Sequence, residues 1–240
     1  MTRSKLPQFP AAGLNFLRKL KRNNRREWFL LHKQDYENFV RQPMIELVNA
    51  LASEFATFAP EIVASPKVSL YRIYRDTRFS KDKSPYKTHA AAGFSPRGLE
   101  KNQGAGFYLH IAPAEFLIGG GLYSPEPEDL AAVRRHIALH HIRLLSILKA
   151  RQFRRLFSTL SGEQLVRVPR GFPADHPAAD LLRRKQFLAS RLLPSDTVTT
   201  AQFGSIVLET FHALHPLLQF LNEPLLRTRD VNQRRAALML

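Results

Sequence analysis

The sequence predicts an α+β fold in which a small, mainly antiparallel sheet is flanked by an N-terminal helical segment and by C-terminal helices. Two observations predict it. Apolar residues recur at helical spacing near both ends of the chain, whereas the middle contains short runs rich in β-branched and aromatic residues. The 240 residues contain no internal repeat and no Gly/Ser-rich linker, so we expect one domain spanning residues 1–240.

The N-terminal quarter shows the spacing of three consecutive helices. Leu14, Leu17 and Leu20 mark a first helix over residues 13–22. Asn24, with Glu27 three residues later, has the spacing of a capping pair that starts a second helix. The apolar face of that helix is formed by Trp28, His32, Tyr36 and Val40. A third helix is expected from Pro43 to the loop at residues 59–60.

The middle of the chain predicts four strands, at residues 67–74, 88–94, 105–112 and 115–122. The last two are separated only by Pro113 and Ala114, which predicts an antiparallel hairpin. Residues 164–168 and 186–193 are further candidates for strands.

Helical spacing returns after Pro125, where one or two long helices fit, and again over residues 199–221. We expect the last helix to kink at Pro216. A basic C-terminal tail follows over residues 225–240.

The chain is strongly basic, with 36 Lys and Arg residues against 20 Asp and Glu residues. Such a charge attracts anions, which include phosphate esters and nucleic acid. The absence of Cys excludes a disulfide framework and a thiolate metal site. No sequence pattern indicates a cofactor, and we expect none. Without a long apolar run or a secretory signal, we expect a cytoplasmic protein with no membrane partner. The oligomeric state is left open.

The densest concentration of polar chemistry lies in residues 71–89, where cations alternate with aromatic and hydroxyl side chains. Guanidinium, ammonium, hydroxyl and phenol groups together are the donors that surround a bound phosphate or carboxylate. Two carboxylates in the segment can each orient a neighbouring cation. The alternative is a salt-bridge lattice that holds a long loop against the sheet. The candidate ligand-binding residues of this segment are Arg72, Arg75, Asp76, Arg78, Lys81, Asp82, Lys83, Tyr86, Lys87 and His89.

Three further candidates come from outside this segment. Trp28 and His32 lie within about one helical turn of each other, and His32 either faces a ligand or packs as a core-edge imidazole on Trp28 and Tyr36. Arg170 lies on a distant loop that would join the site if the two loops meet. We expect no metal site, because His136 and His140 have a metal-binding spacing without a recognisable third ligand.

Several of these sequence blocks resemble the conserved hypothetical family known as domain of unknown function 2461, over about residues 9–224. The longest block is Arg72-Ile-Tyr-Arg-Asp-Thr-Arg-Phe-Ser-Lys-Asp-Lys-Ser-Pro-Tyr-Lys-Thr-His89. Shorter blocks are Asn23-Asn-Arg-Arg-Glu-Trp-Phe29 with His32-Lys33 and Tyr36, Gly119-Gly-Gly-Leu-Tyr123, Pro169-Arg-Gly-Phe172, Asp175-His-Pro177 and Lys185. The resemblance implies one globular domain, of bacterial origin, and it brings no established activity, cofactor or catalytic residue.

Two functions therefore compete. The first is binding of a phosphate- or carboxylate-bearing ligand in a cleft lined by Arg and Lys, with catalysis left open and no catalytic residue assigned. The second is a nucleic-acid-binding module whose basic segments, at residues 18–26, 72–87, 134–155 and 227–235, form one surface stripe.

Overall fold

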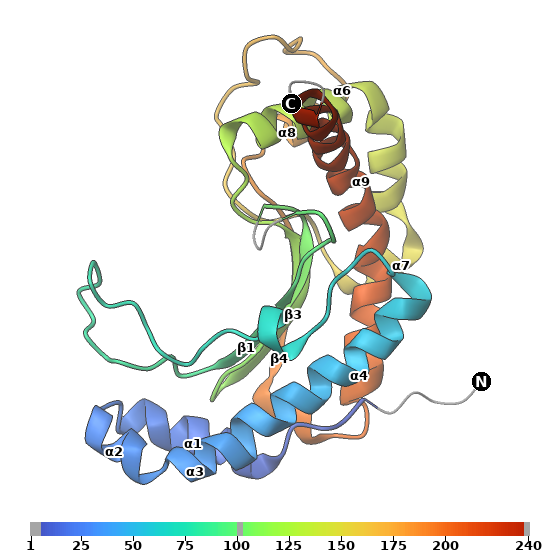
Figure 1. Ribbon diagram of the computed structural model, residues 1–240. Coiled ribbons are helices and arrows are strands. Elements are labelled where there is room, and N and C mark those ends of the chain that lie inside the picture. Colours follow the sequence, from blue (N-terminus) through green and yellow to red (C-terminus); the bar gives the residue numbers. More distant parts are fainter. Residues whose placement is uncertain (1–5, 100–102, 238–240) are drawn as a thin grey trace. The chain divides into compact units, whose positions relative to one another are not determined.

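The computed structural model describes residues 6–99 and 103–237 of the chain. It confirms an α+β fold with one four-stranded antiparallel sheet, whose strands follow in the order β1-β2-β3-β4 (Figure 1). The strands are β1 (Ala90–Phe94), β2 (Gly106–Ile111), β3 (Glu115–Leu122) and β4 (Phe187–Pro194).

The chain divides into two compact units, each built from several stretches of sequence. Unit 1 comprises residues 1–94, 108–118 and 191–209, and unit 2 comprises residues 95–107, 119–190 and 210–240. The expectation of a single domain stays a prediction.

Unit 1 contains the helical N-terminal quarter. Leu14, Leu17 and Leu20 of its first helix are buried, as their spacing predicts. Phe55 packs edge-on against Phe94 of β1, with ring centroids 5.2 Å apart. The helical elements of this unit are α1 (Ala11–Arg22), α2 (Arg26–Leu31), α3 (Lys33–Tyr36), the π-helix η1 (Glu37–Arg41), α4 (Gln42–Phe58), α5 (Pro66–Ser69) and the 3₁₀-helix η2 (Ser195–Thr199).

Unit 2 contains most of the C-terminal helices. Phe107 of β2 stacks on Phe211 with a centroid distance of 4.5 Å. The buried side chain of Asn222 bonds to the backbone N–H and C=O of Ala105, each at 2.8 Å, and so satisfies two buried polar groups just ahead of β2. The helices are α6 (Pro127–Lys149), α7 (Arg151–Leu156), α8 (Ala179–Leu182) and α9 (Phe203–Ala237), the first residues of which belong to unit 1.

The strand predicted over residues 67–74 is wrong. Pro66 occupies the first turn of the short helix α5, which its fixed φ favours. Beyond this helix, Leu70 and Tyr74 form only isolated bridges, to Ala92 and Tyr86. The strand propensity of Val68 does not prevail, because its side chain remains half exposed and strand propensity depends on burial.

The predicted capping role of Asn24 is also wrong. Helix α2 begins at Arg26, and no side chain caps it. Asn24 instead donates from Nδ2 to the carbonyl oxygen of Tyr86 at 2.9 Å and accepts from the Tyr86 N–H at 3.1 Å.

The remaining differences concern element boundaries. In residues 164–168 only Gln164 pairs, through a single bridge to Arg184, whereas the other candidate strand is β4. Helix α6 departs from helical geometry at His140. Helix α9 extends to Ala237, into the basic C-terminal tail, of which residues 238–240 lie outside the described part of the chain. The expected kink at Pro216 stays a prediction.

The glycine run at the end of β3 permits a close approach of two strands. A Cβ on Gly121, which has φ +133°, would lie 1.9 Å from the carbonyl oxygen of Phe187 in β4. A Cβ on Gly120 would lie 2.5 Å from the carbonyl oxygen of Gly106 in β2. The run therefore serves the close packing of neighbouring strands.

We expect Gly121→Ala to destabilise the protein by about 3 kcal/mol or more, since overpacking adds to the strain of a left-handed backbone. Gly171→Ala is the matched control, because Gly171 has φ +91° but a Cβ added there would meet no other atom within 4 Å. The control should lose only about 1–2 kcal/mol. Urea unfolding of both variants measures the difference, and equal losses would contradict the packing argument.

Candidate ligand pocket and imidazole cluster

The basic segment, residues 71–89, forms a long loop that extends outward and comes back to the start of β1 (Figure 1). At its base, the N–H of Lys87 donates to the carbonyl oxygen of Ile73 at 2.7 Å, and that of Arg75 to the carbonyl oxygen of Pro85 at 2.9 Å. We call residues 75–84 the arm. These two hydrogen bonds hold both ends of the arm together.

Most charged side chains of the arm form hydrogen bonds or ion pairs with other residues of the arm. Arg78 donates to both carboxylate oxygens of Asp76, at 3.0 and 2.7 Å, and Arg75 pairs with Asp82. The hydrogen bonds from Arg75 and Ser84 hold the pKa of Asp82 well below its usual range. Lys83 donates to the carbonyl oxygen of Thr77 at 2.9 Å. Asp76 and Asp82 thus orient guanidinium groups, as the sequence predicts, and Arg75 and Arg78 each bond to a different carboxylate.

Three other predicted site residues pack in aromatic stacks. Tyr86 is buried and stacks on Phe29 at 4.1 Å. His32 stacks on Trp28 at 4.1 Å, and its Nδ1 lies 2.8 Å from the carbonyl oxygen of Trp28. This geometry agrees with the core-edge packing of His32 on Trp28. Neither Trp28 nor His32 lines the pocket of unit 1.

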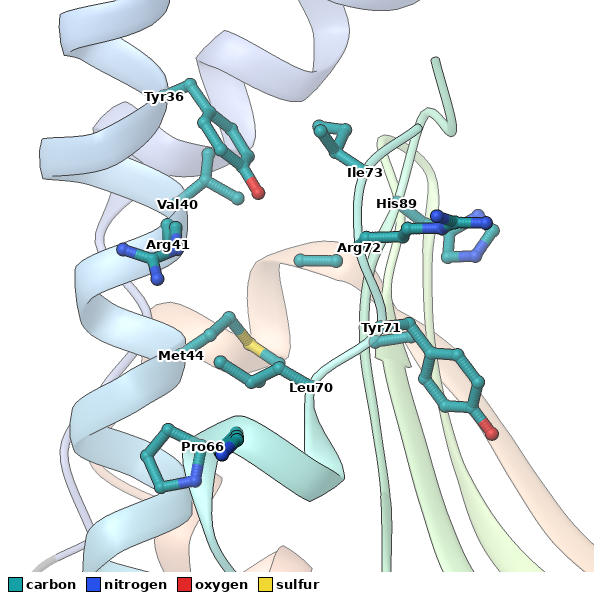
Figure 2. Close-up of a pocket in the computed structure, with 13 residues that line it drawn as sticks. Tyr36, Val40, Arg41, Met44, Pro66, Leu70, Tyr71, Arg72, Ile73 and His89 are labelled. Carbon is teal, nitrogen blue, oxygen red and sulfur yellow. The ribbon is translucent and has the colours of Figure 1, made fainter. Parts of the chain in front are cut away.

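A pocket of about 230 Å³ lies in unit 1, between the helices η1 and α4 and the chain that leads into β1. Figure 2 shows Tyr36 and Met44 on the helical side and Ile73 on the opposite side, with the hydroxyl of Tyr36 pointing across. The side chains of Arg72 and His89 extend away from the helices. The lining residues are Tyr36, Val40, Arg41, Met44, Pro66, Lys67, Leu70, Tyr71, Arg72, Ile73, His89, Ala90 and Ala91.

Among the described residues, the pocket lining contains cations and phenols but no carboxylate. Of its cations, Arg41 pairs with Glu37 of η1 at 3.1 Å. The side chain of Arg72 has no ion pair within the described ranges. Burial, with the nearby Glu37, raises the pKa of Tyr36 to about 12, so its hydroxyl remains a hydrogen-bond donor at neutral pH.

Beside the pocket, titratable side chains gather on one face of the sheet. Side chains alternate along β2, so Phe107, Leu109 and Ile111 are buried while Tyr108 and His110 share the opposite face. The rings of His89 and His110 lie 5.1 Å apart. We call Lys87, His89, Tyr108, His110 and Glu115 the imidazole cluster.

The hydrogen bonds of His110 define its tautomer. Its Nε2 lies 3.4 Å from Glu115 Oε1, and its Nδ1 lies 3.2 Å from the Tyr108 hydroxyl. A carboxylate only accepts, so Nε2 carries the proton, and Nδ1 then accepts from Tyr108. Both nitrogens of His110 are therefore occupied.

The cluster and the adjoining pocket are short of negative charge. Burial, His110 and Lys87 lower the pKa of His89 to about 4, and Glu115 offsets this only in part. Burial and the charge of Arg72 lower the pKa of Lys87 as well. The ammonium of Lys87 donates to the carbonyl oxygen of Arg72 at 3.0 Å and lies over the ring of Tyr71. Partly buried groups that disfavour their own positive charge would gain from a bound anion.

The structure therefore brings together only part of the predicted set. Arg72 and His89 line the pocket, and Lys87 adjoins it. Lys81 is exposed on the arm. Arg170 is exposed in unit 2, and its expected place at the site stays a prediction. Sequence reasoning missed Tyr36, Arg41 and Lys67 in the pocket lining. It also missed Tyr108, His110 and Glu115, although their alternation in the predicted hairpin was a usable signal.

Two further findings concern metals and membranes. In the described part of the chain, no group of three or more His, Asp or Glu residues is placed to hold a metal ion. None of the helices in that same part is both long and apolar enough to span a bilayer.

Fold and site thus define an α+β protein with a cationic pocket next to paired imidazoles. A family model described as conserved hypothetical protein (DUF2461) matches residues 12–220, and the chain belongs to this family. Searches of curated proteins and of solved structures found no match.

The lowered pKa of His89 makes stability depend on pH. Between pH 6.5, near the ordinary pKa of histidine, and about pH 4, the unfolded chain binds a proton that the folded chain does not. Stability contributed by neutral His89 is therefore lost as the pH falls through this window. We expect His89→Gln to lose less stability than the wild type between pH 6.5 and 4.5, measured by urea unfolding. The exposed His140→Gln serves as a control, and equal slopes for His89→Gln and the wild type would contradict this assignment.

Proposed function

We propose that the protein binds a small ligand carrying a phosphate or carboxylate group, held by Arg72, Lys87 and His89 where the pocket meets the imidazole cluster. One observation carries the proposal: cations and imidazoles crowd here while the nearby carboxylates already have partners. Glu115 bonds to His110, and Glu37 to Arg41. An anionic ligand would supply the missing negative charge.

The pocket also suits the uncharged part of such a ligand. Val40, Met44, Leu70 and Ile73 provide an apolar wall in a cavity of about 230 Å³. An apolar wall with a few polar groups at one end is typical of small-molecule sites. The proposed ligand therefore combines one anionic group with a small apolar body.

We expect Arg72→Ala and Lys87→Ala each to weaken binding of phenyl phosphate or benzoate by about ten- to a hundredfold, since a hydrogen bond to a charged group contributes about 1.5–3 kcal/mol. Isothermal titration calorimetry measures the affinity, and thermal unfolding checks that the variants fold. Lys21→Ala, on an exposed position of α1, is the matched control and should bind as the wild type does. A wild type that binds neither anion would overturn the proposal.

A second candidate function, nucleic-acid binding, is favoured by the arm. Its ion pairs brace it internally, and Phe79 is 95 % exposed at a position beside the Arg78 guanidinium, which lies 5.8 Å from the ring centroid. An exposed aromatic ring among cations is the combination that stacks on bases and contacts phosphates.

If the arm binds single-stranded nucleic acid, Phe79→Ala should weaken binding of a fluorescent oligothymidylate by about 1–3 kcal/mol, the contribution of one stacked base. The exposed Leu31→Ala on α2 is a control for loss of an exposed apolar side chain. Fluorescence anisotropy at several salt concentrations measures the affinity. Binding that is insensitive to both Phe79 and salt would rule out this role for the arm.

A further inference from the structure

We propose that the pocket selects a small phosphate monoester over a carboxylate, and that His89 shares one proton with the bound phosphate group. This inference rests on the proposed anion site and specifies its ligand. It depends on the contrast between the two imidazoles of the cluster.

His89 is the imidazole whose nitrogens are available. Glu115 and Tyr108 bond to the ring of His110, whereas the ring of His89 forms no hydrogen bond to the part of the chain whose side chains the structure describes. It lines the pocket and is only partly exposed. A neutral imidazole carries one N–H donor and one nitrogen acceptor, so His89 can both give a hydrogen bond to a ligand and accept one from it.

The surroundings of His89 explain why its imidazole remains neutral until a ligand binds. Its own segment contributes Lys87, whereas Tyr36 and Arg41 lie on the helical side of the pocket, from which the His89 side chain extends away. The groups from other elements are Lys67 of α5, Arg72 and Tyr71 of the following loop, Tyr108 and His110 of β2 and Glu115 of β3. Glu115 is the carboxylate in this set, and it faces His110. A second proton on His89 would therefore lack a carboxylate partner of its own among the residues that the structure describes.

A phosphate monoester can supply both the charge and the proton. Its second pKa is about 6, so near neutral pH it exists as a dianion in ready exchange with a protonated monoanion. The dianion would bind with one proton from solvent, which lies between a phosphate oxygen and a His89 nitrogen. No bond between heavy atoms forms or breaks in this step.

A carboxylate lacks this option. With an ordinary pKa of about 4, it carries a single charge at neutral pH and only accepts hydrogen bonds. It gives less stabilisation to the surrounding cations and has no proton to share with His89. The site should therefore distinguish the two ligand classes by charge and by proton uptake.

Calorimetric titration with phenyl phosphate and with benzoate tests the inference, because both probes present the same apolar ring. We expect phenyl phosphate to bind at least about tenfold more tightly at pH 7. Titrations in buffers of different ionisation enthalpy should show uptake approaching one proton for phenyl phosphate and none for benzoate. Above pH 7 the affinity for phenyl phosphate should fall by up to about tenfold per pH unit more than that for benzoate.

The variant His89→Gln keeps an amide donor and acceptor but cannot take up a proton. It should lose the proton uptake and the preference for phenyl phosphate, so that its affinities for phenyl phosphate and benzoate lie within about twofold of each other. His140→Gln, on α6 of unit 2, is the control and should retain both properties.

The outcomes separate the two proposals. A wild type that binds both probes equally and without proton uptake overturns the phosphate preference but supports the anion site. A His89→Gln variant with unchanged proton uptake also overturns the role of His89. Failure of the wild type to bind either probe overturns the anion site itself.

Discussion

The position of the candidate site depends on how Asn24 holds the backbone of Tyr86. The amide of Asn24 forms hydrogen bonds with both the N–H and the C=O of that residue, and the ring of Tyr86 is buried on Phe29. The helical N-terminal segment thereby fixes the chain just beyond the arm. Lys87 and His89 follow directly, so this contact also determines where the cation and the imidazole enter the sheet face. The residue that would ordinarily cap a helix is used here to place the site.

The electrostatic character of the site follows from an unequal distribution of carboxylates. On the arm, Asp76 and Asp82 accompany Arg78 and Arg75, and these exposed pairs contribute little to stability. Closer to the sheet, the partly buried side chains of Lys87 and His89 form no ion pair with a carboxylate within the described ranges. Burial makes uncompensated charge more costly, so the cluster and not the arm is where a bound anion changes the energy most.

The sequence allowed much of the fold to be predicted, because local patterns determine it. The strand over residues 115–122 agrees with β3, and the leucine spacing of the first helix agrees with the buried face of α1. The helix at Pro66 was missed because a proline at the first turn outweighed a strand-like run. At the site, Arg72, Lys87 and His89 could be predicted because they belong to one continuous sequence motif. The partners Tyr36, His110 and Glu115 come from other elements, and only pairing of the strands and packing of the helices brings them near. That Asp76 and Asp82 would orient neighbouring cations could be predicted from the sequence, whereas the pairing of Arg75 with Asp82 and of Arg78 with Asp76 depends on the geometry of the loop.

The π-helix η1 makes the pocket sensitive to chain length. Its wider turn accommodates one residue more than an α-helix does, directly between Tyr36 and Met44, both of which line the pocket. Deleting a single residue from Glu37–Arg41 would allow a regular helix to form, and each residue of an α-helix turns the chain by about 100°. One of these two side chains would then rotate out of the cavity while the helix itself persisted. A relative that differs here by one deletion would keep the fold and lose this wall of the pocket.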